Sequence, residues 1–282
     1  MENYIICVPS YKRAETCRDK TLAMLKKNKI DKRIINVFVA NKTEHEIYKQ
    51  MLDKETYGNL IVGKKGLVQQ REFIQKHYPK NTNILFLDDD VESVDLTLSS
   101  QFKGFSLDKF VKSAFKICKK ENAHIWGVYP VFNPFFRKPK PEITTSLKYI
   151  VGAFYGIINQ QSNNKLVLSL TKKFNGQKED VERTIKYFIQ DGKVVRFNRV
   201  GFTTKYYGKS GGLGTFEARL KPMLEASKQL KSTYPEFGEI STKKTGMTEF
   251  KLRNLKEVPE RFQKKKTRKN VKKVKRNKTQ RK

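Results

Sequence analysis

Three consecutive carboxylates follow a short apolar run in the first third of the chain. Asp88, Asp89 and Asp90 come directly after Ile84–Leu87. An apolar strand of this kind delivers the acids to the edge of a sheet, and in an extended chain Asp88 and Asp90 share one face while Asp89 takes the other. Acids this close repel one another unless a cation neutralises them. The pattern therefore predicts a site for Mg²⁺ or Mn²⁺ at Asp88 and Asp90, since both ions bind few carboxylates together with phosphates and water.

The triplet by itself is compatible with a solvated surface turn or with other classes of enzyme. Acidic triplets are common on exposed turns, although the apolar run before this one favours a built site. Nucleotidyltransferases and nucleases also end strands in acids. In each of these enzymes, as in a sugar transferase, the metal would stabilise the charge that develops on a departing diphosphate or phosphate.

Short apolar runs alternate with helical segments along the first ninety residues, which is typical of a doubly wound α/β sheet. In such a sheet, ligands bind beyond the carboxyl ends of the strands, where these acids would lie. The runs expected to be strands are Tyr4–Val8, Ile34–Ala40, Asn59–Val62 and Ile84–Leu87, and the expected helices are Glu15–Lys27, Glu44–Leu52 and Leu67–His77.

The second half of the chain has a less regular pattern of strands and helices. We expect helices over Phe110–Lys120, Glu179–Gln190 and Thr215–Thr233, apolar segments over Ile125–Phe136 and Tyr149–Asn159, a hairpin partner at Lys165–Leu170, and a strand over Lys193–Asn198. Five aromatic side chains in the first apolar segment could stack on bases, but aromatics on apolar strands more often form core; they are Trp126, Tyr129, Phe132, Phe135 and Phe136.

The turn after the first expected strand carries a family resemblance. Val8–Arg13 reads Val-Pro-Ser-Tyr-Lys-Arg. It resembles the segment that closes the first strand in GT-A glycosyltransferases, and especially in the TET-associated glycosyltransferases of phages and large DNA viruses. The resemblance implies that this turn contacts the nucleotide of a sugar donor, through Pro9, Ser10, Tyr11 and Arg13.

Two further motifs extend the resemblance to the donor phosphates. Gly66–Arg71 is similar to the glycine-led helix of the family, whose arginine, here Arg71, approaches the donor. Asp88–Asp90 fits the DxD motif, which holds the diphosphate of the donor through a divalent ion. The implied fold is a GT-A-like mixed sheet flanked by helices. The implied domain covers residues 1–258, with a nucleotide-sugar-binding half at 1–95 and an acceptor half at 96–258.

The acceptor half contains two weaker motifs. Glu179 and Asp180 resemble the acidic pair that starts an acceptor-side helix, where the aspartate of an inverting enzyme acts as general base. The competing interpretation is that both acids complement the helix dipole. Gly211 and Gly212 lie in a glycine-rich segment, 208–214, which such enzymes often use as a flap over the phosphates. An ordinary loop is the alternative. All three histidines precede this segment, so no late histidine completes the metal site.

The positive charge of the chain is the outlier of its composition. Net charge is +32, and residues 261–282 contain no acid. The lysines and arginines of residues 1–260 still outnumber the acids, so a polyanionic partner is favoured for the body as well. The tail at 259–282 is expected to be disordered and to grip DNA phosphates, or to act as an import signal or solubility device. Its binding residues would be Lys264, Lys265, Lys266, Arg268, Lys269, Lys272 and Lys273.

Three features bear on the setting. Cys7, Cys17 and Cys118 are scattered and lack metal-ligand spacing, which indicates reduced thiols, with Cys7 in the core. No apolar stretch is long enough for a membrane span, and the N-terminus does not have the pattern of a signal peptide. We expect a cytoplasmic or nuclear location, and the family resemblance implies the host cell of a large DNA virus or phage.

The predicted function is metal-dependent transfer of a sugar from a nucleotide-sugar donor to a hydroxymethylated base in DNA. The resemblance implies UDP-glucose or a close relative as donor, and inversion at the anomeric carbon if Asp180 is the base. Two alternatives remain: a GT-A enzyme that acts on a protein or glycan, and a non-catalytic DNA-binding protein on a degenerate transferase fold.

Overall fold

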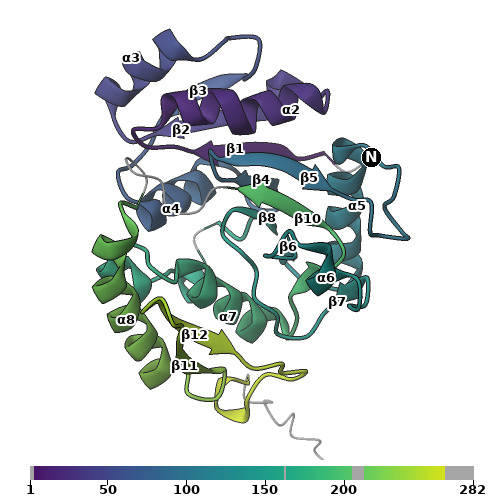
Figure 1. The fold of residues 1–282 in the computed structure, drawn as a ribbon, viewed down its shortest axis with the longest axis vertical. Coiled ribbons are helices and arrows are strands. Elements are labelled where there is room, and N and C mark those ends of the chain that lie inside the picture. Colours follow the sequence, from purple (N-terminus) through teal and green to yellow (C-terminus); the bar gives the residue numbers. More distant parts are fainter. Residues whose placement is uncertain (1–2, 162, 205–212, 264–282) are drawn as a thin grey trace, which may run out of the picture.

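A mixed eight-stranded sheet forms the centre of the molecule (Figure 1). The computed structural model describes residues 3–161, 163–204 and 213–263. The strand order is β3-β2-β1-β4-β8-β6-β9-β7. Strands β1 to β4 are mutually parallel where they pair, and β8 runs antiparallel between β4 and β6. The predicted fold class, a doubly wound mixed α/β sheet, is confirmed.

The first half follows the predicted alternation of strands and helices closely. Its strands are β1 (Ile5–Pro9), β2 (Ile35–Val39), β3 (Asn59–Val62) and β4 (Asn83–Leu87), and its helices are α1 (Ala14–Thr16), α2 (Ala23–Lys27), α3 (Lys42–Met51) and α4 (Leu67–His77). A π-helical segment, Cys17–Leu22, joins α1 to α2, so the helix predicted over Glu15–Lys27 is continuous. Strand β3 differs from expectation because it forms the sheet edge and is partly exposed.

The second half contains one segment that the sequence mispredicts. Its elements are β5 (Val91–Asp95), α5 (Leu107–Lys120), β6 (Ile125–Val128), α6 (Pro134–Arg137), β7 (Ile143–Thr144), β8 (Phe154–Ile158), α7 (Glu179–Asp191), β9 (Val195–Phe197), β10 (Gly201–Thr204), α8 (Phe216–Thr233), β11 (Gly238–Thr242) and β12 (Thr248–Leu252). The hairpin partner predicted at Lys165–Leu170 is wrong. Short 3₁₀ turns occupy this region, and β8 pairs with β4 and β6 instead.

Helices cover both faces of the sheet, and each face has its own apolar core. Ile6 and Val8 of β1 join one core with α2 and α5, whereas Cys7 points to the other, with α4, α7 and α8. Alternate residues of a strand face opposite sides, so a strand covered on both faces is apolar throughout. Cys7, Cys17 and Cys118 are all buried free thiols. In the described part of the chain, no helix is long and apolar enough to cross a membrane.

Two small antiparallel sheets flank the central one. Strands β5 and β10 form a two-stranded ribbon, in which Gly201 faces Asp95 and Thr204 faces Val91. Strands β11 and β12 form a hairpin that packs against α8. Figure 1 shows the β5–β10 ribbon running alongside the central sheet toward α6. The ribbon therefore connects the end of β4 with the segment that follows β6.

Close packing on the central strand β8 yields a stability prediction. A Cβ atom at Gly156 would lie 2.2 Å from Nε1 of Trp126, a fully buried side chain. Overpacking of a core typically costs about 1–3 kcal/mol, so Gly156→Ala should lower the free energy of unfolding by that order. Trp126→Phe removes the clashing ring nitrogen, so the double variant should lose less than the sum of the single variants. Urea denaturation measures this coupling, and strict additivity would contradict the packing argument.

Candidate active site at the carboxyl ends of the strands

The three aspartates lie where β4 ends and β5 begins. Asp88 directly follows β4, and Asp89 and Asp90 form a turn before Val91. The chain does not stay extended through the triplet, because Asp89 and Asp90 form the turn that leads into the β5–β10 ribbon. Asp88 and Asp90 do not simply share one face. Asp89 and Asp90 are buried, whereas the Asp88 side chain is 36% exposed.

The turn after β1 packs against these acids. The Arg13 guanidinium lies 3.0 Å from Asp89 Oδ1 and donates a 2.7 Å hydrogen bond to Asp90 Oδ2. Ser10 Oγ donates to Asp89 Oδ2 at 2.5 Å. The Tyr48 hydroxyl contacts Ser10 at 2.6 Å and accepts from the Arg13 backbone N–H. The turn residues and the acids, which the sequence singled out separately, thus form one cluster.

The remaining residues predicted in this turn lie at its surface end. Pro9 is the last residue of β1, and Tyr11 follows it with its ring under the ammonium groups of Lys12 and Lys65, at 5.5 and 5.8 Å from the ring centroid. The backbone of Lys12 adopts φ +55°. Tyr11 and the two lysines therefore form a group of their own at this turn.

Arg71 connects the acids to the acceptor half. Its guanidinium donates to Asp88 Oδ1 at 3.0 Å, to the Gly152 carbonyl at 2.8 Å, and to Glu179. Glu179 also accepts from Arg183 at 2.5 Å, one helical turn later on α7. Arg71, Glu179 and Arg183 are almost completely buried. Arg71 therefore lies behind Asp88, at the junction of α4 and α7.

An aromatic floor supports this buried charge network. The Arg183 guanidinium lies 3.7 Å from the Tyr155 ring centroid, and Arg71 lies 5.4 Å from it. Tyr155 stacks on Phe86 of the neighbouring strand at 4.9 Å. Cations over an aromatic face are attracted to it, most strongly where water is excluded. The floor therefore fixes both guanidinium groups in place.

The electrostatics of the cluster favour a cation. Burial raises the pKa of Asp88 to about 6. The positive charge of Arg71 lowers this pKa, whereas the negative charge of Asp90 raises it further. Burial likewise raises the pKa of Asp89 to about 7, against the effect of Arg13 and the hydrogen bond from Ser10. The four carboxylates (Asp88, Asp89, Asp90 and Glu179) face three guanidinium groups (Arg13, Arg71 and Arg183), so the fully ionised cluster is net negative.

Asp180 differs from its neighbour Glu179 in exposure and contacts. Glu179 is 3% exposed and held between two arginines, whereas Asp180 is only partly buried. The Tyr149 hydroxyl donates a hydrogen bond to Asp180 Oδ2. Asp180 thus keeps an accessible carboxylate at the start of α7, and Glu179 beside it fixes the helix to Arg71.

Two threonines complete the cluster, and local sequence patterns gave no signal for either. Thr204, the last residue of β10, donates to Asp90 Oδ1 at 2.5 Å. Thr21 donates to the Asp88 carbonyl at 2.7 Å and accepts from the Val91 backbone N–H at 2.9 Å. Both contacts join residues far apart in the chain. Only Arg183 had a sequence signal, its i,i+4 spacing from Glu179.

The residues present fit a divalent metal in part. In the described ranges no group of three or more His, Cys, Asp or Glu side chains has the arrangement of a metal site. Asp88 and Asp90 nevertheless offer carboxylate oxygens in a net negative cluster. Mg²⁺ and Mn²⁺ accept one or two carboxylates when phosphates and water supply the remaining ligands. The donor set therefore suits a metal that arrives with a phosphate ligand.

Several predicted residues fall outside the described part of the chain. They are Gly211 and Gly212 of the glycine-rich segment, and Lys264, Lys265, Lys266, Arg268, Lys269, Lys272 and Lys273 of the tail. Their proposed roles in phosphate and nucleic-acid binding stay predictions.

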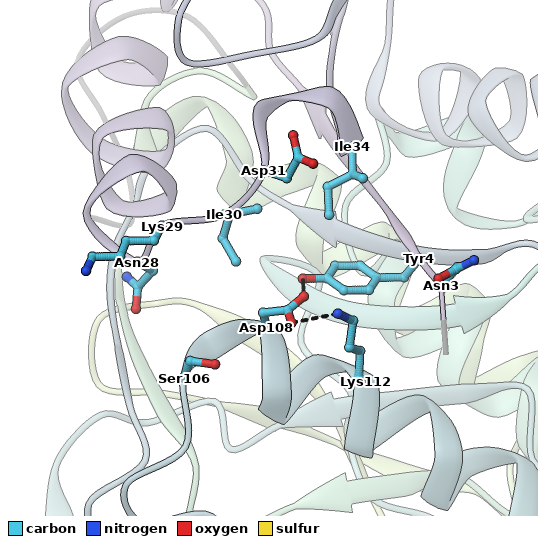
Figure 2. A pocket seen from close by; sticks show the side chains of 10 residues that line it. All are labelled: Asn3, Tyr4, Asn28, Lys29, Ile30, Asp31, Ile34, Ser106, Asp108 and Lys112. Carbon is cyan, nitrogen blue, oxygen red and sulfur yellow. Dashed lines mark hydrogen bonds and ion pairs between the residues drawn. The ribbon is translucent and has the colours of Figure 1, made fainter. Parts of the chain in front are cut away.

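A separate pocket of about 500 Å³ lies at the opposite edge of the sheet. It is lined by Tyr4 before β1, Ile34 before β2, and Asp108 at the start of α5, among others (Figure 2). The Tyr4 hydroxyl donates to Asp108, which also binds Lys112 (Figure 2). The pocket lies at the amino ends of the strands, whereas the carboxylate cluster lies at their carboxyl ends, so the two are far apart in the fold.

The fold and this cluster define the class of the protein. A parallel β1–β4 unit, followed by acids at its carboxyl edge and a mixed extension, is the arrangement expected of a nucleotide-sugar-dependent glycosyltransferase. The chain belongs to the TET-associated glycosyltransferase family, whose model matches residues 4–206. No curated protein matches the sequence significantly.

Solved structures of glycosyltransferases resemble this chain at low sequence identity. TarS 1–349 from S. aureus in complex with UDP is 13% identical, with a TM-score of 0.46 over 81% of this chain and 65% of that one. The mannosyltransferase PcManGT from Pyrobaculum calidifontis, with GDP-Man and Mn²⁺, is 11% identical, with a TM-score of 0.46 over 83% and 64%. Glucosyl-3-phosphoglycerate synthase from Mycobacterium tuberculosis, with Mn²⁺, UDP-Glc and phosphoglyceric acid, is 8% identical, with a TM-score of 0.46 over 88% and 86%. This chain therefore spans less than two thirds of the TarS chain.

The buried network predicts that Glu179 is essential for stability. Glu179→Gln would leave Arg71 and Arg183 short of a counter-charge, and breaking a buried pair in this way costs about 3–5 kcal/mol. Urea denaturation should therefore show a marked loss in the free energy of unfolding. Glu239→Gln, which breaks an exposed pair with Arg253, is the control and should leave stability unchanged. Equal stability of the two variants would contradict the proposed importance of the network.

Proposed function

We propose that this chain transfers glucose from UDP-glucose to a hydroxymethylated base in DNA. The observation that carries the proposal is the Arg71–Glu179 pair, which joins the acids after β4 to the start of α7, where Asp180 lies. Donor-side and acceptor-side motifs of one family therefore meet at one edge of the sheet. DNA as the acceptor is supported by the family membership and by the net charge of +32.

Asp88 and Asp90 would hold the divalent metal of the donor complex. When bound, the metal would neutralise the charge that develops on the departing diphosphate. Arg13 pairs with Asp89 and Asp90, and its side chain is 19% exposed, so its guanidinium can also contact a phosphate oxygen of the donor. Tyr11, with Lys12 and Lys65 next to its ring, would contact the nucleotide, as the family resemblance implies.

Asp180 would act as the general base. In the proposed step the acceptor hydroxyl oxygen attacks the anomeric carbon, the bond from that carbon to the diphosphate oxygen breaks, and the hydroxyl proton passes to the Asp180 carboxylate. The Tyr149 hydroxyl orients this carboxylate. Attack opposite the leaving group inverts the anomeric carbon. A base within a duplex must leave the stack before its hydroxymethyl group can reach the donor.

Mass spectrometry tests the proposed function directly. DNA that contains hydroxymethylcytosine or hydroxymethyluracil is incubated with Mn²⁺ and a panel of sugar nucleotides, and a hexose should appear on the modified base only. Asp90→Ala should abolish transfer while DNA binding persists. Transfer to a protein or glycan, with modified DNA inert, would favour the alternative acceptor class. DNA binding without transfer or donor hydrolysis would favour a non-catalytic protein on this fold.

Asp180→Asn distinguishes a general base from a helix cap. Asparagine keeps the size of the side chain and can still accept from Tyr149, but it cannot take a proton. We expect kcat to fall by about 10²–10⁴, the usual contribution of general-base catalysis, with little change in donor affinity. Asp19→Asn, at an exposed aspartate that pairs with Arg18, is the control. A fully active Asp180→Asn enzyme with reduced stability would assign Asp180 to helix capping alone.

Truncation tests whether the basic tail binds DNA. The cut belongs after Gln263, because the Phe262 ring still packs on Phe237 at 5.2 Å and on Tyr234 at 5.7 Å. Removing 264–282 should weaken DNA binding and flatten the dependence of log affinity on log salt, since each phosphate contact contributes about 0.9 to that slope. Donor hydrolysis should be unaffected. Fluorescence anisotropy over a salt series measures the slope, and an unchanged slope would remove the tail from DNA binding.

A further inference from the structure

Four apolar side chains lie exposed together on the segment that follows β6. Val131 and Phe132 are each 42% exposed, Phe136 is 48% exposed, and Phe135 is 75% exposed. We call these four residues the aromatic platform. The rings of Phe135 and Phe136 contact each other edge-to-face, with centroids 5.2 Å apart. Contiguous exposed apolar surface of this kind marks an interaction site more often than isolated exposed residues do.

The platform is anchored in the fold. Its helix α6 is capped by Asn133 and begins with Pro134. Arg137, the last residue of α6, is fully buried, donates to Asp95 at 2.5 Å, and donates to the Arg199 carbonyl at 3.1 Å. The Phe132 ring lies 5.3 Å from the Arg137 guanidinium. The phenylalanines are therefore presented on a fixed support and keep their exposure without rearrangement.

Three lysines lie on or near the segment that carries the platform. Lys138 and Lys140 are exposed, and Lys148 is partly exposed. In the part of the chain that the structure describes, none of these three lysines lies in an ion pair. Burial lowers the pKa of Lys148, and the nearby charges of Arg196 and Lys140 lower it further. Apolar rings with uncompensated cations beside them complement a strand that has both bases and phosphates.

The β5–β10 ribbon connects the platform to the carboxylate cluster. Arg137 binds Asp95 at one end of β5, and Asp90 binds Thr204 at the other. Four residue steps separate the ends of β5, which corresponds to about 13 Å at the rise of a strand. A second path runs through Arg196, whose guanidinium lies 5.0 Å from the Tyr129 ring centroid and donates to the Tyr149 carbonyl. Tyr149 then reaches Asp180.

We propose that the aromatic platform stacks against bases of the acceptor DNA beside the nucleotide that is modified, while Lys138, Lys140 and Lys148 contact its phosphates. The proposal rests on DNA being the acceptor of the proposed function. An aromatic face pairs with any base, so the contact selects for unstacked nucleic acid and not for a sequence. When the acceptor base leaves the duplex, its neighbouring bases lose a stacking partner. The platform would take the place of that partner.

The double variant Phe135→Ala/Phe136→Ala tests the platform. Affinity for an unmodified single-stranded oligonucleotide, measured by fluorescence anisotropy, should fall about tenfold or more, in line with the loss of a stacked base. The salt slope should stay unchanged, because neither side chain contacts phosphate. Lys138→Ala/Lys140→Ala should instead reduce the slope by about 1.4, since each phosphate contact on a single strand contributes about 0.7. Ile240→Ala, at a 40% exposed apolar side chain on β11, is the control and should bind normally.

A gain-of-signal variant keeps the test informative. Phe135→Trp should restore affinity in the Phe136→Ala background, and the fluorescence of the introduced indole should be quenched by added DNA; the native Trp126 is fully buried and gives a constant background. Unchanged DNA affinity in the double alanine variant, or fluorescence of the Phe135→Trp variant that DNA leaves unaltered, would overturn the proposal. Conversion of a dimer to a monomer in sedimentation, with DNA binding intact, would assign the platform to self-association and also overturn it.

The binding assays separate this proposal from the proposed function. They use unmodified DNA and no donor, so they decide on stacking even if no sugar is transferred. Donor hydrolysis by the double variant should remain at the level of the native chain, because no platform residue contacts the carboxylate cluster in the described structure. Failure of transfer with normal stacking would reject the proposed acceptor chemistry alone.

Discussion

The buried ion pair between Arg71 and Glu179 is the constraint on which the site depends. Neither side chain retains more than a few per cent exposure, so each charge depends on its partners for compensation. Arg71 divides its donors between Asp88, Glu179 and the Gly152 carbonyl, and thereby ties the end of β4 to the start of α7. A shift of either element would break the Arg71–Glu179 pair and leave both buried charges with less compensation. The relative position of Asp88 and Asp180 is therefore fixed by electrostatics as much as by apolar packing.

The same network explains how the site can accept a highly charged donor. Arg13 offsets part of the negative charge of Asp89 and Asp90, and Arg71 offsets part of that of Asp88. A divalent cation and the diphosphate ester of a sugar nucleotide bring opposite charges that cancel, so their joint arrival leaves the net charge of the cluster unchanged. Either one alone would meet a like charge or lose its hydration without full compensation. The chemistry favours binding of the metal together with the donor.

The sequence predicts those parts of the fold that local patterns determine. Helix α4 begins and ends at the predicted residues because Gly66, with φ +100°, starts it and the apolar spacing ends at His77. The acids after β4 were identified because a buried strand precedes them. Whether the triplet is extended could not be read from the sequence, since the turn at Asp89 and Asp90 leads into β5, whose partner β10 is over a hundred residues away.

Contacts between distant segments account for the remaining errors and omissions. Nothing near Thr204 or Tyr149 indicates that they bind Asp90 and Asp180, because both contacts arise only when the sheet is assembled. Apolar residues at Lys165–Leu170 suggested a strand, but β8 already has β4 and β6 on its two edges and leaves no edge for a further partner. The expected core role of the aromatic group holds for Trp126 and fails for Phe135, which local pattern cannot distinguish.

A carboxylate at each end of strand β5 pairs with an arginine, and these two ion pairs fix the positions of both ends of the strand. Asp90, immediately before the strand, is bound by Arg13, and Asp95, its last residue, is bound by Arg137. The middle of the strand is comparatively exposed, so its position depends on these two ends and on its pairing with β10. The surface attached to Arg137 therefore keeps a constant distance from Asp90, near which the donor is proposed to bind. The proposed transfer to a base in DNA would require such a constant distance, because misplacement by about 1 Å can cost a hundredfold in rate.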